Sequence, residues 1–118
     1  MKIEMGHTEI FVKNPLTAKN FYIDVLGFAI EVIQHEKFVW LKKDSAVILL
    51  RPGNPVNPST YQEANIAFVI YTDNLDEAKK NITSKGIEFK GTDGSENCLT
   101  FTDYDGNWFQ LVDKNSAH

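Results

Sequence analysis

Apolar and polar side chains alternate over residues 5–12, and this period of two predicts a strand. The stretch at 15–26 then carries apolar residues at helical spacing, with Asn14 as its expected cap and Gly27 as its expected end. The buried stripe of this helix is expected to contain Leu16, Phe21, Tyr22 and Val25. Short apolar runs then predict strands at residues 28–34, 37–41 and 46–50.

The same order returns further along the chain. A strand is expected at 65–70 and a helix follows it, capped by Asp73 or Asn74 and ended by Gly86. Three more strands are expected at residues 87–90, 98–102 and 107–112. Residues 51–63 hold three of the four prolines and predict a linker. We therefore expect an α+β fold of two βαβββ modules in a single domain 1–118. The modules would span about 1–50 and 64–118, with the linker 51–63 between them.

The last two strand patterns flank the dipeptide Asp105-Gly106. Asp-Gly between two alternating runs is a strong hairpin signal, because glycine accepts the positive φ that tight turns require. The outgoing strand places Phe109 and Leu111 on one side and Trp108 and Gln110 on the other.

Composition narrows the possible partners. The chain has 118 residues, a net charge of −4 and no basic stripe, so nucleic acid is not expected as a partner. No apolar run reaches membrane-spanning length, and we see no secretory signal pattern, so a cytoplasmic protein without a membrane partner is expected. The mildly acidic balance weakly favours cationic ligands. Cys98 is the one cysteine, which excludes an internal disulfide, and we expect it to be a small buried apolar residue.

Each module has one helix, which covers only one face of its sheet. Alternation assigns an apolar set to the covered face: Ile10, Val12, Ile48, Leu50, Ile66, Phe68, Ile70, Phe109 and Leu111. The open face mixes aromatic and isolated polar residues: His7, Glu9, Phe11, Phe38, Trp40, Val47, Leu49, Arg51, Asn65, Ala67, Val69, Trp108 and Gln110. Apolar walls with a few hydrogen-bonding groups are typical of a ligand cavity, although a half-solvated sheet or a dimer interface gives the same pattern.

Several motifs together resemble the vicinal oxygen chelate superfamily, the group of glyoxalases, bleomycin-resistance proteins and extradiol dioxygenases. They are His7 in the first strand, Phe21-Tyr22 before Leu26-Gly27-Phe28, the restart at 65–68 and the run Asp103-Tyr104-Asp105-Gly106-Asn107. The resemblance covers nearly the whole chain. It implies paired modules whose sheets curve around a cleft, a small-molecule ligand, and a homodimer in which clefts form within one chain or between two.

The resemblance also implies where a metal would bind in metal-dependent members. The matching positions here are His7, Leu49, Asn65 and Gln110, where an imidazole or similar donor, a glutamate, a histidine and a glutamate are usual. Only His7 keeps a strong donor, since Leu49 has no donor atom and the two amides are weak ligands for Zn, Ni or Fe. We therefore expect no metal and no cofactor, and a hydrogen-bonding cluster instead.

Three functions remain open from the sequence. The first is a metal-independent small-molecule-binding protein, with a drug or antibiotic as one kind of ligand and with ligand contacts from His7, Glu9, Phe11, Phe38, Trp40, Leu49, Arg51, Asn65, Trp108 and Gln110. The second is a glyoxalase-like lyase or isomerase with a non-standard metal or acid–base site, and the third is a partner-binding module. His7 is a ligand contact, a structural histidine bonded to Gln110 or Asn65, or a metal ligand, and Glu9 and Arg51 could pair. His35 is expected on the solvated surface, and His118 to be disordered.

Overall fold

The structure is a computed structural model that describes residues 1–116. His118, which was expected to be disordered, lies outside the described residues. The chain divides into two compact units, Met1–Pro55 and Val56–His118. The unit boundary falls inside the expected linker, and the single domain 1–118 stays a prediction.

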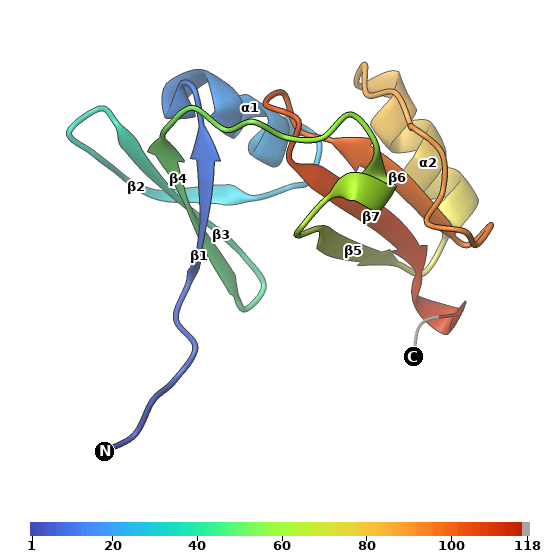
Figure 1. Cartoon of the computed structure of the whole chain (residues 1–118), viewed down its shortest axis with the longest axis horizontal. Helices are drawn as coiled ribbons and strands as arrows, with labels where there is room; N and C mark the ends of the chain where they lie inside the picture. The colour runs from blue at the N-terminus through green and yellow to red at the C-terminus, as the bar shows by residue number, and fades with distance from the viewer. Residues whose placement is uncertain (117–118) are drawn as a thin grey trace. The chain divides into compact units, whose positions relative to one another are not determined.

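The first unit contains a four-stranded sheet and one helix (Figure 1). Its elements are β1 (Thr8–Val12), α1 (Pro15–Asp24), β2 (Ala29–Gln34), β3 (Phe38–Lys43) and β4 (Ala46–Pro52). The strand order is β1-β4-β3-β2, with β1 parallel to β4 and the other pairs antiparallel. This unit therefore has the βαβββ order expected from the sequence.

Helix α1 begins as expected. The side chain of Asn14 accepts a hydrogen bond from the Leu16 backbone N–H at 3.0 Å, and Pro15 occupies the first turn, where no N–H is needed. The helix packs against β3 and β4 and buries Ala18, Phe21 and Tyr22. Leu16 was wrongly placed in the buried stripe, since it is 37% exposed and Ala18 takes its place in the core.

The covered face of this sheet is apolar, as the alternation predicts. The buried residues on its strands are Ile10, Val12, Val39, Leu41, Ile48 and Leu50. The turn between β2 and β3 holds His35 and Glu36, both exposed and both with positive φ. His35 is therefore surface, as expected.

The second unit contains a three-stranded sheet and one α-helix (Figure 1). Its elements are the short 3-10 helix η1 (Tyr61–Glu63), β5 (Phe68–Thr72), α2 (Leu75–Ser84), β6 (Cys98–Thr102), β7 (Trp108–Asp113) and the 3-10 turn η2 (Lys114–Ser116). The strand order is β5-β7-β6, with β5 parallel to β7 and β6 antiparallel to it. Over residues 1–116 the structure is a mixed α+β fold with two small sheets and two α-helices.

The strand expected at 87–90 is absent from the described residues. Backbone hydrogen bonds still join this segment to β6, from Lys90 N–H to the Thr100 carbonyl at 2.7 Å and from Thr100 N–H to the Gly91 carbonyl at 2.9 Å, but the pairing amounts to one isolated bridge between Thr92 and Leu99. Gly91 has a φ of 96°, a conformation that turns the chain and interrupts an extended ladder. The described part of the second unit therefore has the order βαββ, and the expected βαβββ order was wrong there.

Strand β5 begins at Phe68, three residues later than expected. Ile66 lies before the strand and is 70% exposed, so its assignment to the covered face was wrong. The core instead contains Ile82 from α2 and a stack of Phe101 on Phe109, whose ring centroids lie 5.5 Å apart. The ring centroids of Phe68 and Phe109 lie 5.3 Å apart. Aromatic packing thus compensates for a sheet of only three strands.

The hairpin from β6 to β7 forms as expected around Gly106, whose φ is 84°. Asp103 is 4% exposed and lies at the centre of the turn. Its carboxylate accepts from the backbone N–H groups of Asp105 and Asn107, each at 2.9 Å, and from the Asn107 side chain at 2.8 Å. Residues of the turn itself therefore supply the hydrogen-bond donors for the buried Asp103 carboxylate.

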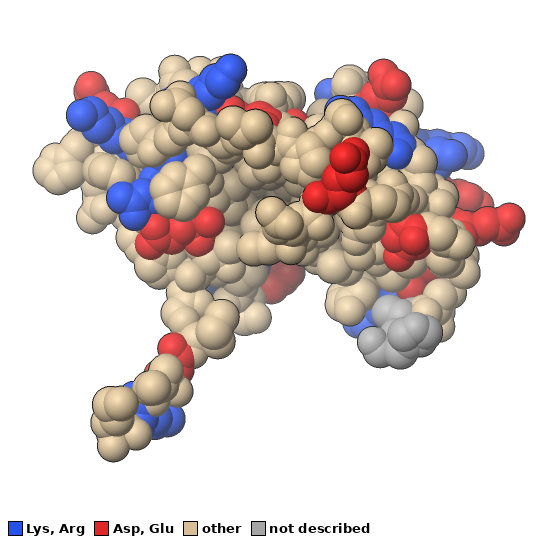
Figure 2. Space-filling model, viewed as in Figure 1, with Lys and Arg blue, Asp and Glu red and all other residues tan. Residues whose placement is uncertain are grey.

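Charged side chains of both signs are interspersed over the face that Figure 2 shows. This pattern agrees with a small net charge of −4 and gives no basic stripe on that face. Among residues 1–116, no helix has the length and apolar character needed to cross a membrane.

Candidate functional site

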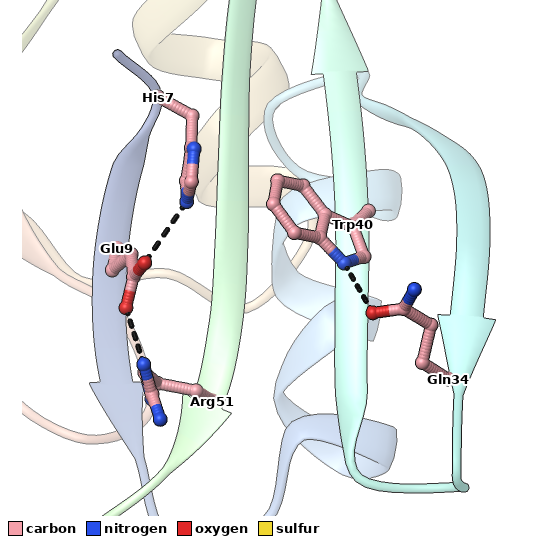
Figure 3. A network of polar contacts seen from close by, with 5 residues as sticks. All are labelled: His7, Glu9, Gln34, Trp40 and Arg51. Atoms are coloured by element: carbon pink, nitrogen blue, oxygen red, sulfur yellow. Dashed lines mark hydrogen bonds and ion pairs between the residues drawn. The ribbon is translucent and has the colours of Figure 1, made fainter.

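The open face of the first sheet brings together most of the residues predicted for a site. Strand register places Glu9 beside Leu49, Leu49 beside Trp40, and Phe11 beside Arg51. His7 lies one residue before β1 and its side chain turns toward Glu9 (Figure 3). Alternation along β1, β3 and β4 therefore assembles this polar and aromatic surface.

Glu9 is the centre of the polar network (Figure 3). Its Oε1 accepts from Arg51 Nη1 at 2.6 Å, and its Oε2 accepts from His7 Nε2 at 2.9 Å. The Arg51 hydrogen bond, followed by that of His7, holds the pKa of Glu9 below its usual value of 4.5. Glu9 is therefore an ionised carboxylate at neutral pH, with both oxygens engaged. The pairing of Glu9 with Arg51 that the sequence suggested is confirmed.

Arg51 also contacts two aromatic rings. Its Cζ lies 5.5 Å from the centroid of Phe11 and 5.7 Å from that of Phe38, which are cation–π distances. The two phenylalanines that were predicted to contact a ligand thus already bind a cation of the protein itself. The cation that these rings contact is therefore Arg51, which does not support the preference for cationic ligands expected from the acidic charge balance.

Trp40 forms the aromatic wall of the surface. Its indole N–H donates to Gln34 Oε1 at 2.9 Å, which fixes the ring on the open face (Figure 3). The His7 ring lies 4.5 Å from the Trp40 ring, tilted by 58°. A cavity of about 470 Å³ adjoins them and is lined by His7, Trp40, Val47 and neighbouring residues. The size is that of a small-ligand pocket.

Leu49 lies between Glu9 and Trp40 in the sheet and is 6% exposed. Its buried hydrocarbon side chain lies between these two residues and has no atom that binds a metal. Its contact with a ligand stays a prediction, as do the ligand contacts of the other residues of this face.

In the second unit, Trp108 and Gln110 are covered by residues that the sequence assigned to the linker. The Trp108 indole N–H donates to the Pro58 carbonyl at 2.9 Å. The Tyr61 ring packs edge-on against the Trp108 ring, with 6.0 Å between the ring centroids. The Gln110 amide donates to the Tyr61 hydroxyl at 2.8 Å. We call residues 58–61 the covering segment. Trp108 is only 2% exposed as a result.

Burial raises the pKa of the Tyr61 phenol above 10.0, and the nearby Asp93 and Cys98 raise it further. Burial likewise raises the pKa of the Cys98 thiol above 9.0, so the neutral thiol is favoured. Cys98 is half-buried, whereas the sequence predicted a buried residue. Neither group is therefore ionised at neutral pH.

Asn65 was expected on a strand and lies instead in the exposed loop before β5. It lines a smaller cavity of about 320 Å³ with Tyr61, Gln62 and Asp93. Tyr61 and Gln34 are polar partners that were not predicted from the sequence. An aromatic residue inside a proline-rich stretch was the available signal for Tyr61, because solvated linkers seldom need one.

The donors present do not fit the metal site that the family resemblance implies. His7 Nε2 is bonded to Glu9, Leu49 offers only carbon, and Gln110 bonds to Tyr61. Among the described residues, no group of three or more histidine, cysteine, aspartate or glutamate side chains is placed to hold a metal. The Arg51 guanidinium, a cation, instead neutralises Glu9.

Comparison with known proteins gives one family. The family model described as the glyoxalase/bleomycin resistance protein/dioxygenase superfamily matches residues 4–111. A search of curated proteins found no match.

Solved structures share the fold. An integron cassette protein from the mobile metagenome of V. cholerae is 24% identical, with a TM-score of 0.72 over 97% of this chain and 98% of that one. The fosfomycin resistance protein FosX from Listeria monocytogenes is 22% identical, with a TM-score of 0.75 over 96% and 92%. Lactoylglutathione lyase from Agrobacterium tumefaciens is 18% identical, with a TM-score of 0.70 over 94% and 93%.

Proposed function

Because this chain belongs to the glyoxalase/bleomycin resistance protein/dioxygenase superfamily, we propose that it is a metal-independent small-molecule-binding protein. The observation that carries this proposal is the donor set. One imidazole, one hydrocarbon and two amides stand at the four positions where metal-dependent relatives are expected to hold their ion. Catalytic metal sites usually need about three strong protein donors.

The open face of the first unit supplies the features of a binding site instead. His7, Glu9 and Arg51 provide fixed polar groups, and Trp40 provides an apolar wall beside the 470 Å³ cavity. A ligand would place its apolar body along Trp40 and its polar groups against this network. Drug or antibiotic binding is one form of this function.

Two measurements on the purified protein test the proposal. Elemental analysis should find no stoichiometric Zn, Ni, Mn or Fe in protein purified without added metal. A thermal-shift screen of small aromatic compounds of both charges, including thiol conjugates, should identify ligands. His7→Ala should weaken a ligand that bonds His7 by roughly 2- to 12-fold, the effect of one hydrogen bond.

His35→Ala is the matched control, because His35 lies exposed in the β2–β3 turn of the same unit. It should leave ligand affinity unchanged. A stoichiometric metal that is lost in His7→Ala and is needed for turnover would overturn the proposal.

A second candidate is a glyoxalase-like lyase or isomerase that uses acid–base chemistry. The observation in its favour is the 2.9 Å contact of His7 with the ionised Glu9, since a carboxylate that orients an imidazole is a common arrangement in proton transfer. Turnover of a thiol adduct that is lost in His7→Ala and much reduced in Glu9→Gln would establish this alternative. Binding without turnover supports the first proposal.

We also propose that the protein is a homodimer. The first unit exposes apolar side chains on its edge strands, Phe11 on β1 and Ile30, Val32 and Ile33 on β2, each 37–48% exposed, and exposed edge strands pair readily with another chain. Sedimentation at tens of micromolar, on the order of ordinary assay concentrations, should give a dimer, and a clean monomer would count against it. The cytoplasmic location stays a prediction.

A further inference from the structure

The guanidinium of Arg51 is held in place before any ligand arrives. Glu9 bonds its Nη1, and the rings of Phe11 and Phe38 lie within cation–π distance of its Cζ. A flexible side chain fixed in this way loses little further freedom when it binds a ligand. Arg51 is therefore pre-organised on the open face of the first unit.

Most of the hydrogen-bonding capacity of Arg51 is unused. A guanidinium has five N–H donors, and within the described residues Arg51 makes one hydrogen bond, to Glu9. Its side chain remains 38% exposed. The free N–H groups therefore face solvent and suit an oxyanion, which accepts two parallel hydrogen bonds from arginine.

The same geometry disfavours a cationic ligand. The rings that would attract a cation, Phe11 and Phe38, are already occupied by Arg51. The carboxylate that would attract one, Glu9, has both oxygens bonded to Arg51 and His7. A cation would therefore have to displace one of these partners, whereas an anion would not.

The spacing of Arg51 and Trp40 on the sheet indicates the size of the ligand. Leu49 precedes Arg51 by two residues on β4 and lies beside Trp40 on β3, so the backbone positions of Arg51 and Trp40 are about 7 Å apart along the strand direction. A carboxylate attached to one aromatic ring spans about this length. The half-buried Trp40, whose ring His7 also contacts, and the adjoining cavity would receive the ring of the ligand.

We propose that Arg51 binds the carboxylate of a small aryl carboxylate whose ring lies along Trp40. The proposal rests on the proposed small-molecule-binding function and names the ligand class of that site.

Three probes with the same ring and different charge test it: phenylacetate, 2-phenylethanol and phenethylamine. The two tryptophans give two indole N–H signals in nitrogen-15 NMR, which Trp40→Phe assigns. Phenylacetate should shift the Trp40 signal and leave that of the covered Trp108 in place. Arg51→Gln should weaken phenylacetate by about tenfold or more, the loss of a charge-assisted hydrogen bond.

Lys42→Gln is the matched control, because Lys42 follows Trp40 by two residues on β3 and loses the same charge from the same face. It should change phenylacetate affinity less than about twofold, as expected of an exposed charge. Arg51→Lys keeps the charge but lacks the guanidinium that binds a carboxylate through two hydrogen bonds, and should give an intermediate loss of phenylacetate affinity. It also serves if Arg51→Gln fails to fold.

Equal losses in Arg51→Gln and Lys42→Gln would overturn the proposal, because they indicate general charge attraction. Equal or tighter binding of phenethylamine would also overturn it, while leaving the small-molecule-binding function intact. The broader function fails separately, if a stoichiometric metal lost in His7→Ala supports turnover.

Discussion

Gln110 donates its side-chain amide to the hydroxyl of Tyr61 at 2.8 Å, and this bond ties the covering segment to the centre of the second sheet. Tyr61→Phe keeps the ring against Trp108 but removes the acceptor. A part-buried amide without a partner costs about 1–3 kcal/mol, so we expect a loss of unfolding free energy of about this size. Urea unfolding followed by circular dichroism measures it.

Tyr71→Phe is the control for this variant. Tyr71 lies on β5 of the same unit and is 57% exposed, so loss of its hydroxyl should change the free energy of unfolding by less than about 0.5 kcal/mol. Equal effects of the two variants would show that the Gln110–Tyr61 bond does not stabilise the unit.

The buried carboxylate of Asp103 should be among the most sensitive positions of the chain. Asp103→Ala leaves three donors from Asp105 and Asn107 without their acceptor, and we expect a loss of about 3 kcal/mol or more in unfolding free energy. Asp103→Asn keeps one oxygen for the backbone donors and should lose less. Asp73→Ala, at an exposed position before α2, should have little effect on the same unfolding curve.

Helix α2 depends on its cap. Asn74 accepts from the Glu77 backbone N–H at 3.0 Å, and its amide donates to the Glu77 carboxylate at 3.2 Å. Asn74→Ala should lower the free energy of unfolding by about 1 kcal/mol. Asn81→Ala, an exposed substitution inside the same helix, should be neutral or slightly stabilising because alanine has the higher helix propensity. Thermal denaturation of both variants tests this ranking.

Acid should weaken the Glu9 network. Because the folded pKa of Glu9 is lower than its ordinary value of 4.5, the ionised carboxylate stabilises the fold above that value. This stabilisation is lost as the pH falls from 4.5 through the folded pKa. Glu9→Gln should therefore flatten the dependence of unfolding free energy on pH in this window. Glu31→Gln, an exposed change on β2, should keep the wild-type slope, and an unchanged slope in Glu9→Gln would contradict the prediction.

Gly53 leaves room for the ring beneath Arg51. A Cβ at this position would lie 2.9 Å from Phe11 Cδ2 and 3.2 Å from Phe11 Cβ, so the ring would have to move. Gly53→Ala should reduce unfolding free energy by about 1 kcal/mol, the lower end for overpacking, because Phe11 is half-exposed and can shift. Gly6→Ala, with nothing within 4 Å of the added Cβ, should leave the unfolding curve unchanged.

Features that depend on neighbouring residues could be predicted from the sequence. The caps Asn14 and Asn74 and the Asp105-Gly106 turn lie where the pattern placed them, because each uses bonds within a few residues. The strand at 87–90 could not be predicted correctly, since apolar content there did not reveal that Gly91 turns the chain. Local rules thus succeed where local bonds decide the structure.

The site was harder to predict because its surroundings come from distant parts of the chain. Alternation placed Glu9 and Arg51 on one face, and parallel pairing of β1 with β4 makes them neighbours. Alternation also placed Trp108 on an open face, but no periodic pattern indicates that Pro58 and Tyr61 cover it. Coverage by a segment outside the regular elements has no periodic signature.

The covering segment also determines where this chain tolerates a crossover with a relative. A chimera joined at residue 64, where the strand–helix order restarts, would take Trp108 and Gln110 from one parent and Pro58 and Tyr61 from the other. The indole N–H and the amide would then depend on an acceptor and a ring that the foreign parent need not supply. A junction between Pro55 and Val56 keeps these partners in one inherited block.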